Sequence, residues 1–134
     1  MLRDLWNYLC VGAGGAIGTM LRFWLSGVVA HAYGERFPTG TLVINITGSF
    51  VIGIFAALAP PEGRWLVGSL PRLFFMIGVC GGYTTFSSFS LQTLNLARDG
   101  QWGLAALNIF LSVALCLLGV WLGFIAGEGL NRNL

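Results

Sequence analysis

The stretch GVCGGYTTFSSFS, residues 78–90, decides the fold of this chain, because it places glycines, hydroxyls and two aromatic rings inside an apolar segment of membrane character. In hydrocarbon each unpaired backbone group costs several kcal/mol, so irregular backbone survives only where protein or a polar cavity receives the freed groups. We therefore expect a transmembrane helix that is broken near its middle, with a functional site at the break.

The chain around this stretch is too apolar for a water-soluble domain. Of its 134 residues, 56% are hydrophobic and 9% are charged, and the mean hydropathy is +0.80. This composition indicates an integral membrane protein. The net charge of +2 is too small and too dispersed for a nucleic-acid-binding surface.

The apolar runs predict four transmembrane helices. With about 20 residues needed to cross the hydrocarbon, the runs fall at about 5–31, 40–59, 66–97 and 102–127. Short segments that carry charges, prolines and glycines separate them. We expect one all-α membrane domain over residues 1–134, with the break in its third span.

The arginines give only a weak signal for orientation. The side that holds both termini collects Arg3, Arg64, Arg72 and Arg132, and the other side collects Arg22, Arg36 and Arg98. Because orientation follows the positive charge of short loops, this near balance is compatible with insertion both ways up and with an antiparallel pair. Four glycine-rich helices are also few for enclosing a pathway, so an oligomer is expected.

The acidic residues avoid the predicted membrane interior. All five lie at span ends or in loops: Asp4, Glu35, Glu62, Asp99 and Glu128. This disfavours proton-coupled transport, which generally needs an intramembrane Asp, Glu or His. The single histidine, His31, ends the first span, and no nucleophile motif, acidic dyad or metal-ligand cluster is present, so the chain is not expected to be an enzyme.

Two polar side chains sit inside apolar segments. Arg22 either extends its guanidinium to water, pins a helix, or raises the local concentration of anions at a vestibule. Asn45 should face protein or a pore, where its amide either donates to a small anion or forms a structural hydrogen bond between helices.

The residues after Gly82 suggest two kinds of ion contact. If they are helical, Phe86 and Phe89 share one face, while Thr85 and Ser88 share another with Gln92. The positive edges of two phenyl rings can coordinate an anion, although core packing is the common role of such a pair. A non-helical turn over residues 81–84 would free carbonyl oxygens that suit Na⁺ or K⁺.

With these residues assembled, the chain resembles the small bacterial fluoride channels, the Fluc or CrcB family. The resemblance covers all four spans. Its elements are GGAIG at 14–18 with Arg22, GTL at 40–42 followed by Asn45, and GGYTTFSSFS at 81–90.

The resemblance implies a dual-topology antiparallel homodimer of four-helix subunits in the bacterial cytoplasmic membrane. Such a dimer would carry two fluoride pores for passive, uncoupled efflux and a structural Na⁺ at the subunit boundary. By the family's pattern, Phe86 and Phe89 would meet fluoride with their ring edges, and Asn45 would donate to it. The backbone carbonyls of Gly81 and Thr84, from both subunits, would bind the Na⁺. Further polar positions for the fluoride track are Thr85, Ser87, Ser88, Asn108 and Ser112, with Arg22 at the vestibule.

Two rival functions belong to other classes. A small dimeric multidrug or cation exporter also has four short spans, but the missing intramembrane carboxylate disfavours it. In a non-transporting assembly subunit, Asn45 and residues 81–90 would serve packing alone.

Overall fold

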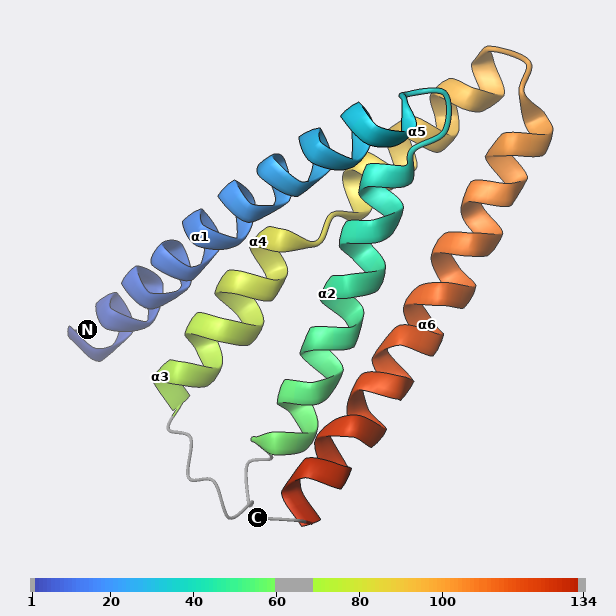
Figure 1. Ribbon diagram of the computed structural model, residues 1–134. Helices are drawn as coiled ribbons and strands as arrows, with labels where there is room; N and C mark the ends of the chain where they lie inside the picture. Colours follow the sequence, from blue (N-terminus) through green and yellow to red (C-terminus); the bar gives the residue numbers. More distant parts are fainter. Residues whose placement is uncertain (1, 60–68, 133–134) are drawn as a thin grey trace.

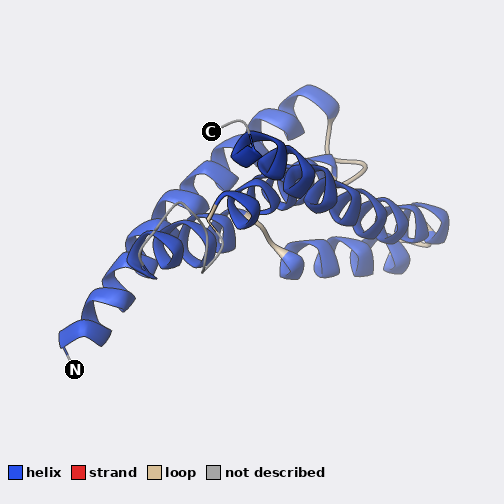
Figure 2. Ribbon diagram, turned by 90° about the horizontal axis from the view of Figure 1, so that it is seen from below, coloured by secondary structure: helices blue, strands red, loops and turns tan. Residues whose placement is uncertain are grey.

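The computed structural model of this chain describes residues 2–59 and 69–132, and every regular element within these ranges is helical (Figures 1 and 2). In chain order the elements are α1 (Leu2–Tyr33), α2 (Thr39–Leu58), α3 (Ser69–Arg72), the π-helical η1 (Leu73–Cys80), α4 (Gly81–Tyr83), α5 (Phe86–Arg98) and α6 (Trp102–Arg132).

Four helical stretches are long and apolar enough to cross a membrane, which confirms the predicted number of spans. They are Asp4–Tyr33, Thr39–Leu58, Ser69–Arg98 and Trp102–Arg132. The third combines α3, η1, α4 and α5, and its predicted start at residue 66, like Glu62 and Arg64, lies outside the described residues. The chain is therefore an all-helical, multi-pass membrane protein.

The fourth helix continues beyond its predicted end at residue 127, to Arg132. At 1.5 Å per residue its 31 residues span roughly 46 Å, against about 30 Å of hydrocarbon. Hydropathy marks only the part within hydrocarbon, so the prediction missed the polar last turns.

The turn between α5 and α6 is built by a glycine. Gly100 has φ +75°, a left-handed conformation that glycine adopts without strain. It lets the Gln101 N–H reach back to the Leu96 carbonyl at 2.8 Å, which closes the end of α5. The two helices consequently run back along each other from this turn.

Two helix pairs form the body of the protein: α1 packs against η1 and α4, and α2 packs against α6 (Figure 1). A β-carbon at Gly18 would collide with the carbonyl oxygen of Val79, and one at Gly123 would collide with the carbonyl oxygen of Phe50. Because glycine has no side chain, the backbones of the paired helices come into contact at these positions, as small residues generally allow in membrane helices.

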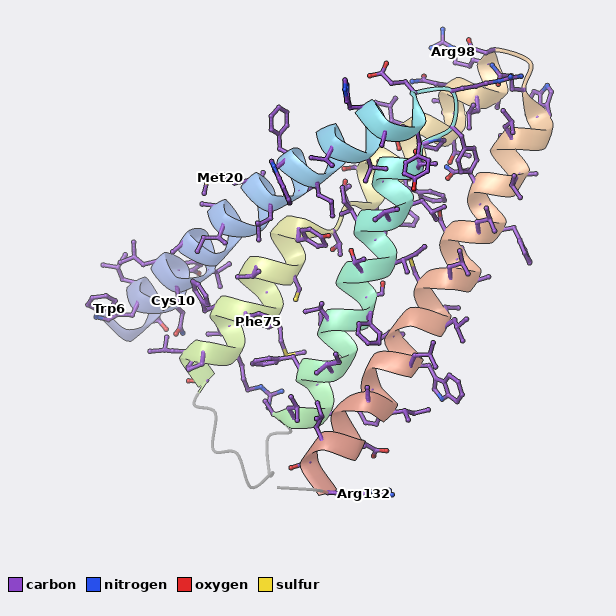
Figure 3. The ribbon with its side chains drawn as sticks, viewed as in Figure 1. Trp6, Cys10, Met20, Phe75, Arg98 and Arg132 are labelled. Carbon is purple, nitrogen blue, oxygen red and sulfur yellow. The ribbon has the colours of Figure 1, made fainter. Side chains whose placement is uncertain are left out.

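The outward sides of the helices carry large apolar residues. Trp6, Met20 and Phe23 on α1 are 61%, 63% and 83% exposed, and Figure 3 shows Trp6 and Met20 pointing away from the other helices. Phe75 on η1 instead points toward α2, where its ring stacks on that of Phe55 with centroids 4.5 Å apart. Such an exposed apolar surface suits lipid.

We predict that Gly123→Ala lowers the stability of the protein, because the added methyl meets backbone that cannot move away. Overpacking of this kind costs about 1 to 3 kcal/mol. Gly103→Ala on the same helix is the control, since a β-carbon there meets nothing within 4 Å. Thermal unfolding in detergent should separate the two variants, and equal melting temperatures would contradict the close packing of α2 on α6.

Candidate functional site

The third span leaves helical geometry at two threonines. Thr84 has φ −82° and ψ 159°, and Thr85 has φ −152° and ψ 113°, so both are extended. The expected turn over residues 81–84 is therefore displaced: Gly81 and Gly82 are helical. The β-branched threonines accept extended backbone readily, whereas a β-carbon at Gly82 would collide with the backbone of Gly15 on α1.

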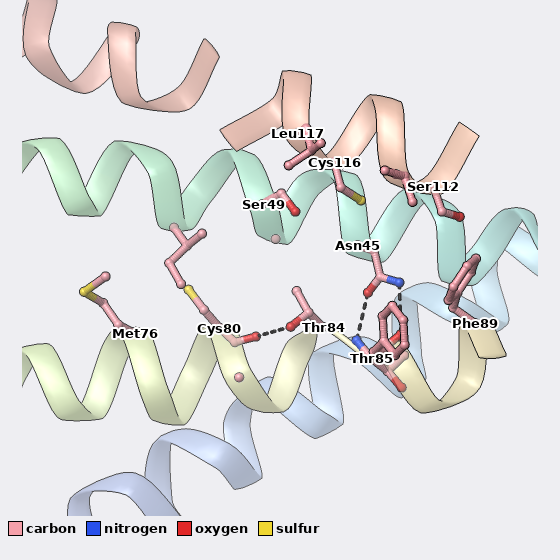
Figure 4. Close-up of a pocket in the computed structure, with 15 residues that line it drawn as sticks. Asn45, Ser49, Met76, Cys80, Thr84, Thr85, Phe89, Ser112, Cys116 and Leu117 are labelled. Atoms are coloured by element: carbon pink, nitrogen blue, oxygen red, sulfur yellow. Dashed lines mark hydrogen bonds between the residues drawn. The ribbon is translucent and has the colours of Figure 1, made fainter. Parts of the chain in front are cut away.

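Asn45 on α2 pairs with the backbone of Thr85 in both directions (Figure 4). Its Nδ2 donates to the Thr85 carbonyl at 3.0 Å, and the Thr85 N–H donates to its Oδ1 at 2.8 Å. The amide side chain thus satisfies both polar groups of an extended residue inside a membrane span. Of the two roles open for Asn45, the structural hydrogen bond is formed, and it leaves one N–H of the amide for other partners.

The same rearrangement releases two backbone carbonyls. In a continuous α-helix the Thr85 N–H would bond to the Gly81 carbonyl, and the Ser88 N–H to the Thr84 carbonyl. Here the Thr85 N–H donates to Asn45, and the Ser88 N–H donates to the Thr85 hydroxyl at 3.2 Å, which caps α5. The carbonyl oxygens of Gly81 and Thr84 therefore lack their usual α-helical donors, and carbonyl oxygens are ligands that a hard cation accepts.

A cavity of about 440 Å³ adjoins the break and gathers seven of the predicted site residues (Figure 4). These seven are Asn45, Gly81, Thr84, Thr85, Phe86, Phe89 and Ser112. The remaining lining residues are Gly48, Ser49, Ile52, Met76, Cys80, Val113, Cys116 and Leu117. None of the side chains described around it is charged. We call this space the central cavity.

The two phenylalanines of the central cavity form a tilted pair. Their ring centroids are 5.2 Å apart and their planes differ by 54°, midway between a stacked and a perpendicular arrangement. Phe89 is 8% exposed and Phe86 is 77% exposed. The Phe89 ring thus lies in the interior of the protein, and the Phe86 ring lies on its surface.

Four predicted site residues do not line the central cavity: Ser87, Ser88, Asn108 and Arg22. The Ser87 hydroxyl lies 3.3 Å from the Thr85 hydroxyl, within hydrogen-bond distance. Ser88 lies behind Thr85, whose hydroxyl donates to the Ser88 hydroxyl at 3.0 Å. Asn108 is 1% exposed and bonds to neighbouring side chains. Arg22 is half-buried on α1 and lines none of the cavities found among the described residues.

A second, polar cavity of about 480 Å³ follows along α2 and α5 toward the α1–α2 and α5–α6 turns. On α2, Thr41 lines this second cavity and Asn45, one turn later, lines the central cavity. On α5, Gln92 lines the second and Phe89 the first. Asn45 and Phe89 consequently line the uncharged central cavity at its end nearest the second cavity, which we call the polar vestibule.

Sequence reasoning missed several lining residues. Thr41 and Ser49 lie four residues before and after Asn45, and Cys116 lies four residues after Ser112. Spacing of i and i+4 puts them on the same helix faces as the residues that were found, which was the available signal. The Cys80 and Cys116 side chains also line the central cavity.

Comparison with known proteins gives one consistent result. Residues 9–124 match the family described as CrcB-like protein, Camphor Resistance (CrcB). The chain is 63% identical over 124 residues to the fluoride-specific ion channel FluC of Opitutus terrae, an alignment that covers 92% of this chain and 94% of the relative. It is 60% identical to the protein of the same name from Rhodospirillum rubrum over 127 residues, which are 95% of this chain and 98% of the relative.

Proposed function

The chain belongs to the CrcB family, and from that premise we propose that it is a fluoride-selective channel that carries F⁻ passively across the bacterial cytoplasmic membrane. The family is one of ion channels, so the chain is not an enzyme. The observation that carries the proposal is the uncharged central cavity behind a polar vestibule, with Asn45 and Phe89 between them.

The chemistry of the central cavity suits a small, strongly hydrated anion. Leaving water, fluoride must exchange its hydration shell for donors. The hydroxyl of Ser112, the second amide N–H of Asn45 and the ring edges of Phe86 and Phe89 supply them. Because no cationic side chain lines the cavity among the described residues, the ion is not held too tightly to leave.

A pair of subunits with a central Na⁺ belongs to the same proposal. The exposed ring of Phe86 would meet a second copy across its surface, which would complete each of two pathways. The carbonyls of Gly81 and Thr84, released at the break, are hard oxygen ligands of the kind that Na⁺ accepts. Antiparallel pairing would bring two such sets together, and crosslinking of single-cysteine variants that yields only parallel pairs would overturn it.

Fluoride release from liposomes tests the function. The purified protein is reconstituted in liposomes loaded with KF or with KCl, and anion release is recorded after valinomycin is added. We expect fast release of fluoride with chloride retained, because only fluoride should gain enough from the donors of the central cavity. Fluoride release no faster than from protein-free liposomes would refute the channel. Release that depends on a proton gradient would instead favour a coupled exporter.

A further inference from the structure

Asn108 lies in the middle of a chain of hydrogen bonds that joins α5 to α6. Its Nδ2 donates to the Thr93 hydroxyl at 2.8 Å, and the Thr93 hydroxyl donates to the Phe89 carbonyl at 2.7 Å. On its other side, the Ser112 hydroxyl donates to the Asn108 Oδ1 at a longer 3.5 Å. The two ends of the chain, Phe89 and Ser112, both line the central cavity, whereas Asn108 and Thr93 do not.

The burial of Asn108 argues against direct contact with an ion. At 1% exposure it shares with Ile44 the place of most deeply buried large side chain among the described residues. Its amide oxygen and nitrogen both have partners within the subunit. A buried amide with this set of partners holds its neighbours in place, because breaking either bond would leave a polar group unpaired.

The Asn108–Thr93 hydrogen bond joins α5 to α6 at a point close to the central cavity. The turn at Gly100 joins the C-terminal end of α5 to α6, but the aromatic pair sits at the opposite end, in the first turn after Thr85. Among the described residues, this bond is the one side-chain hydrogen bond that links α5 to α6. It therefore ties the middle of α5, one turn after Phe89, to α6, while the Asn45–Thr85 pairing holds the start of α5 to α2.

We propose that Asn108 is a positioning residue, which acts through Thr93 to set the distance of Phe89 on α5 from Ser112 on α6. This inference rests on the proposed channel function and deepens it. The two strong bonds, at 2.8 Å and 2.7 Å, set the depth of Phe89 in the wall of the central cavity. The weak bond at 3.5 Å leaves the Ser112 hydroxyl free to turn toward an ion.

A double-mutant cycle in the full-length reconstituted protein tests this role. Asn108→Leu removes the amide and Thr93→Val removes the hydroxyl that receives it, while Thr93→Ser keeps a hydroxyl. Ala105→Gly is the matched control, because Ala105 is buried on α6 one turn before Asn108 and lines none of the cavities. Glycine there destabilises the helix and leaves the hydrogen bonds intact.

We expect Asn108→Leu and Thr93→Val each to slow fluoride release by about tenfold, and the double variant to be no slower than either, since both break one connection. Thr93→Ser and Ala105→Gly should release fluoride near the wild-type rate, although Ala105→Gly melts at a lower temperature. A purely structural role predicts instead that the rate follows the melting temperature.

Three results would overturn the inference: a wild-type rate for Asn108→Leu, single effects that multiply in the double variant, or slowing by Ala105→Gly equal to that of Asn108→Leu. If Asn108→Leu does not assemble, the contrast between Thr93→Val and Thr93→Ser decides, and equal rates for these two count against the inference. Failure of the channel function itself is seen separately, as absent release by the wild-type protein.

Discussion

Replacement of Asn45 by leucine is expected to stop fluoride release and to destabilise the protein. Leucine has similar size but leaves both the N–H and the carbonyl of Thr85 unpaired within a membrane span. Each unsatisfied buried group costs about 1 to 3 kcal/mol, so the break in the third span would lose its main support. Thermal unfolding in detergent measures the stability, and fluoride release from liposomes measures the function.

Asn45→Asp gives an intermediate test of the same pairing. A carboxylate accepts from the Thr85 N–H but cannot donate to the Thr85 carbonyl, so one of the two bonds is lost. Ile46→Leu, a change of shape without a change of volume at the next residue, is the control. Wild-type stability of Asn45→Leu together with wild-type release would show that the amide pairing supports neither the break nor the pathway.

The second large effect is expected from Phe89→Ile. Isoleucine fills the space with apolar surface but has no ring edge to present to an anion. An aromatic contact of about 1.5 kcal/mol at the barrier corresponds to roughly tenfold in rate, so fluoride release should slow by at least that factor. Phe86→Ile should also slow release, because the two rings form one pair at 5.2 Å.

Phe23→Ile is the control for both aromatic variants, because Phe23 is 83% exposed on α1 and lines none of the cavities described. All three variants must remain assembled by size-exclusion chromatography for the rates to be compared. Unchanged release by both Phe86→Ile and Phe89→Ile would remove the ring-edge mechanism and leave the hydroxyls and the amide as the only donors of the central cavity.

The number of spans was predictable because hydropathy and length alone determine it. The bounds of α2 and the start of α6 were close to those expected, since glycines, prolines and charges mark the turns. The exact position of the break was not predictable. Glycines suggested residues 81–84, but Gly82 is needed for contact with α1, and the extended residues are the threonines that follow.

Sequence reasoning named seven of the residues that line the central cavity, but it did not predict the hydrogen bonds between helices that connect them. Periodicity placed Phe86 beside Phe89 and Ser112 beside Asn108, because those pairs share a helix. The pairing of Asn45 with Thr85 joins residues 40 positions apart, and local sequence carries no information on it. For the same reason the sequence could not show that Asn108 points to Thr93 on another helix.

The pairing of Asn45 with Thr85 resembles one rung of a β-ladder in which a side chain replaces one of the two peptide units. Both bonds go to the backbone of Thr85, so this contact places no demand on the side chain at position 85. It demands at position 45 a group that donates and accepts at the reach of a carboxamide. During evolution, residue 85 can change freely as far as this contact is concerned, whereas no substitution there can compensate for the loss of asparagine at 45.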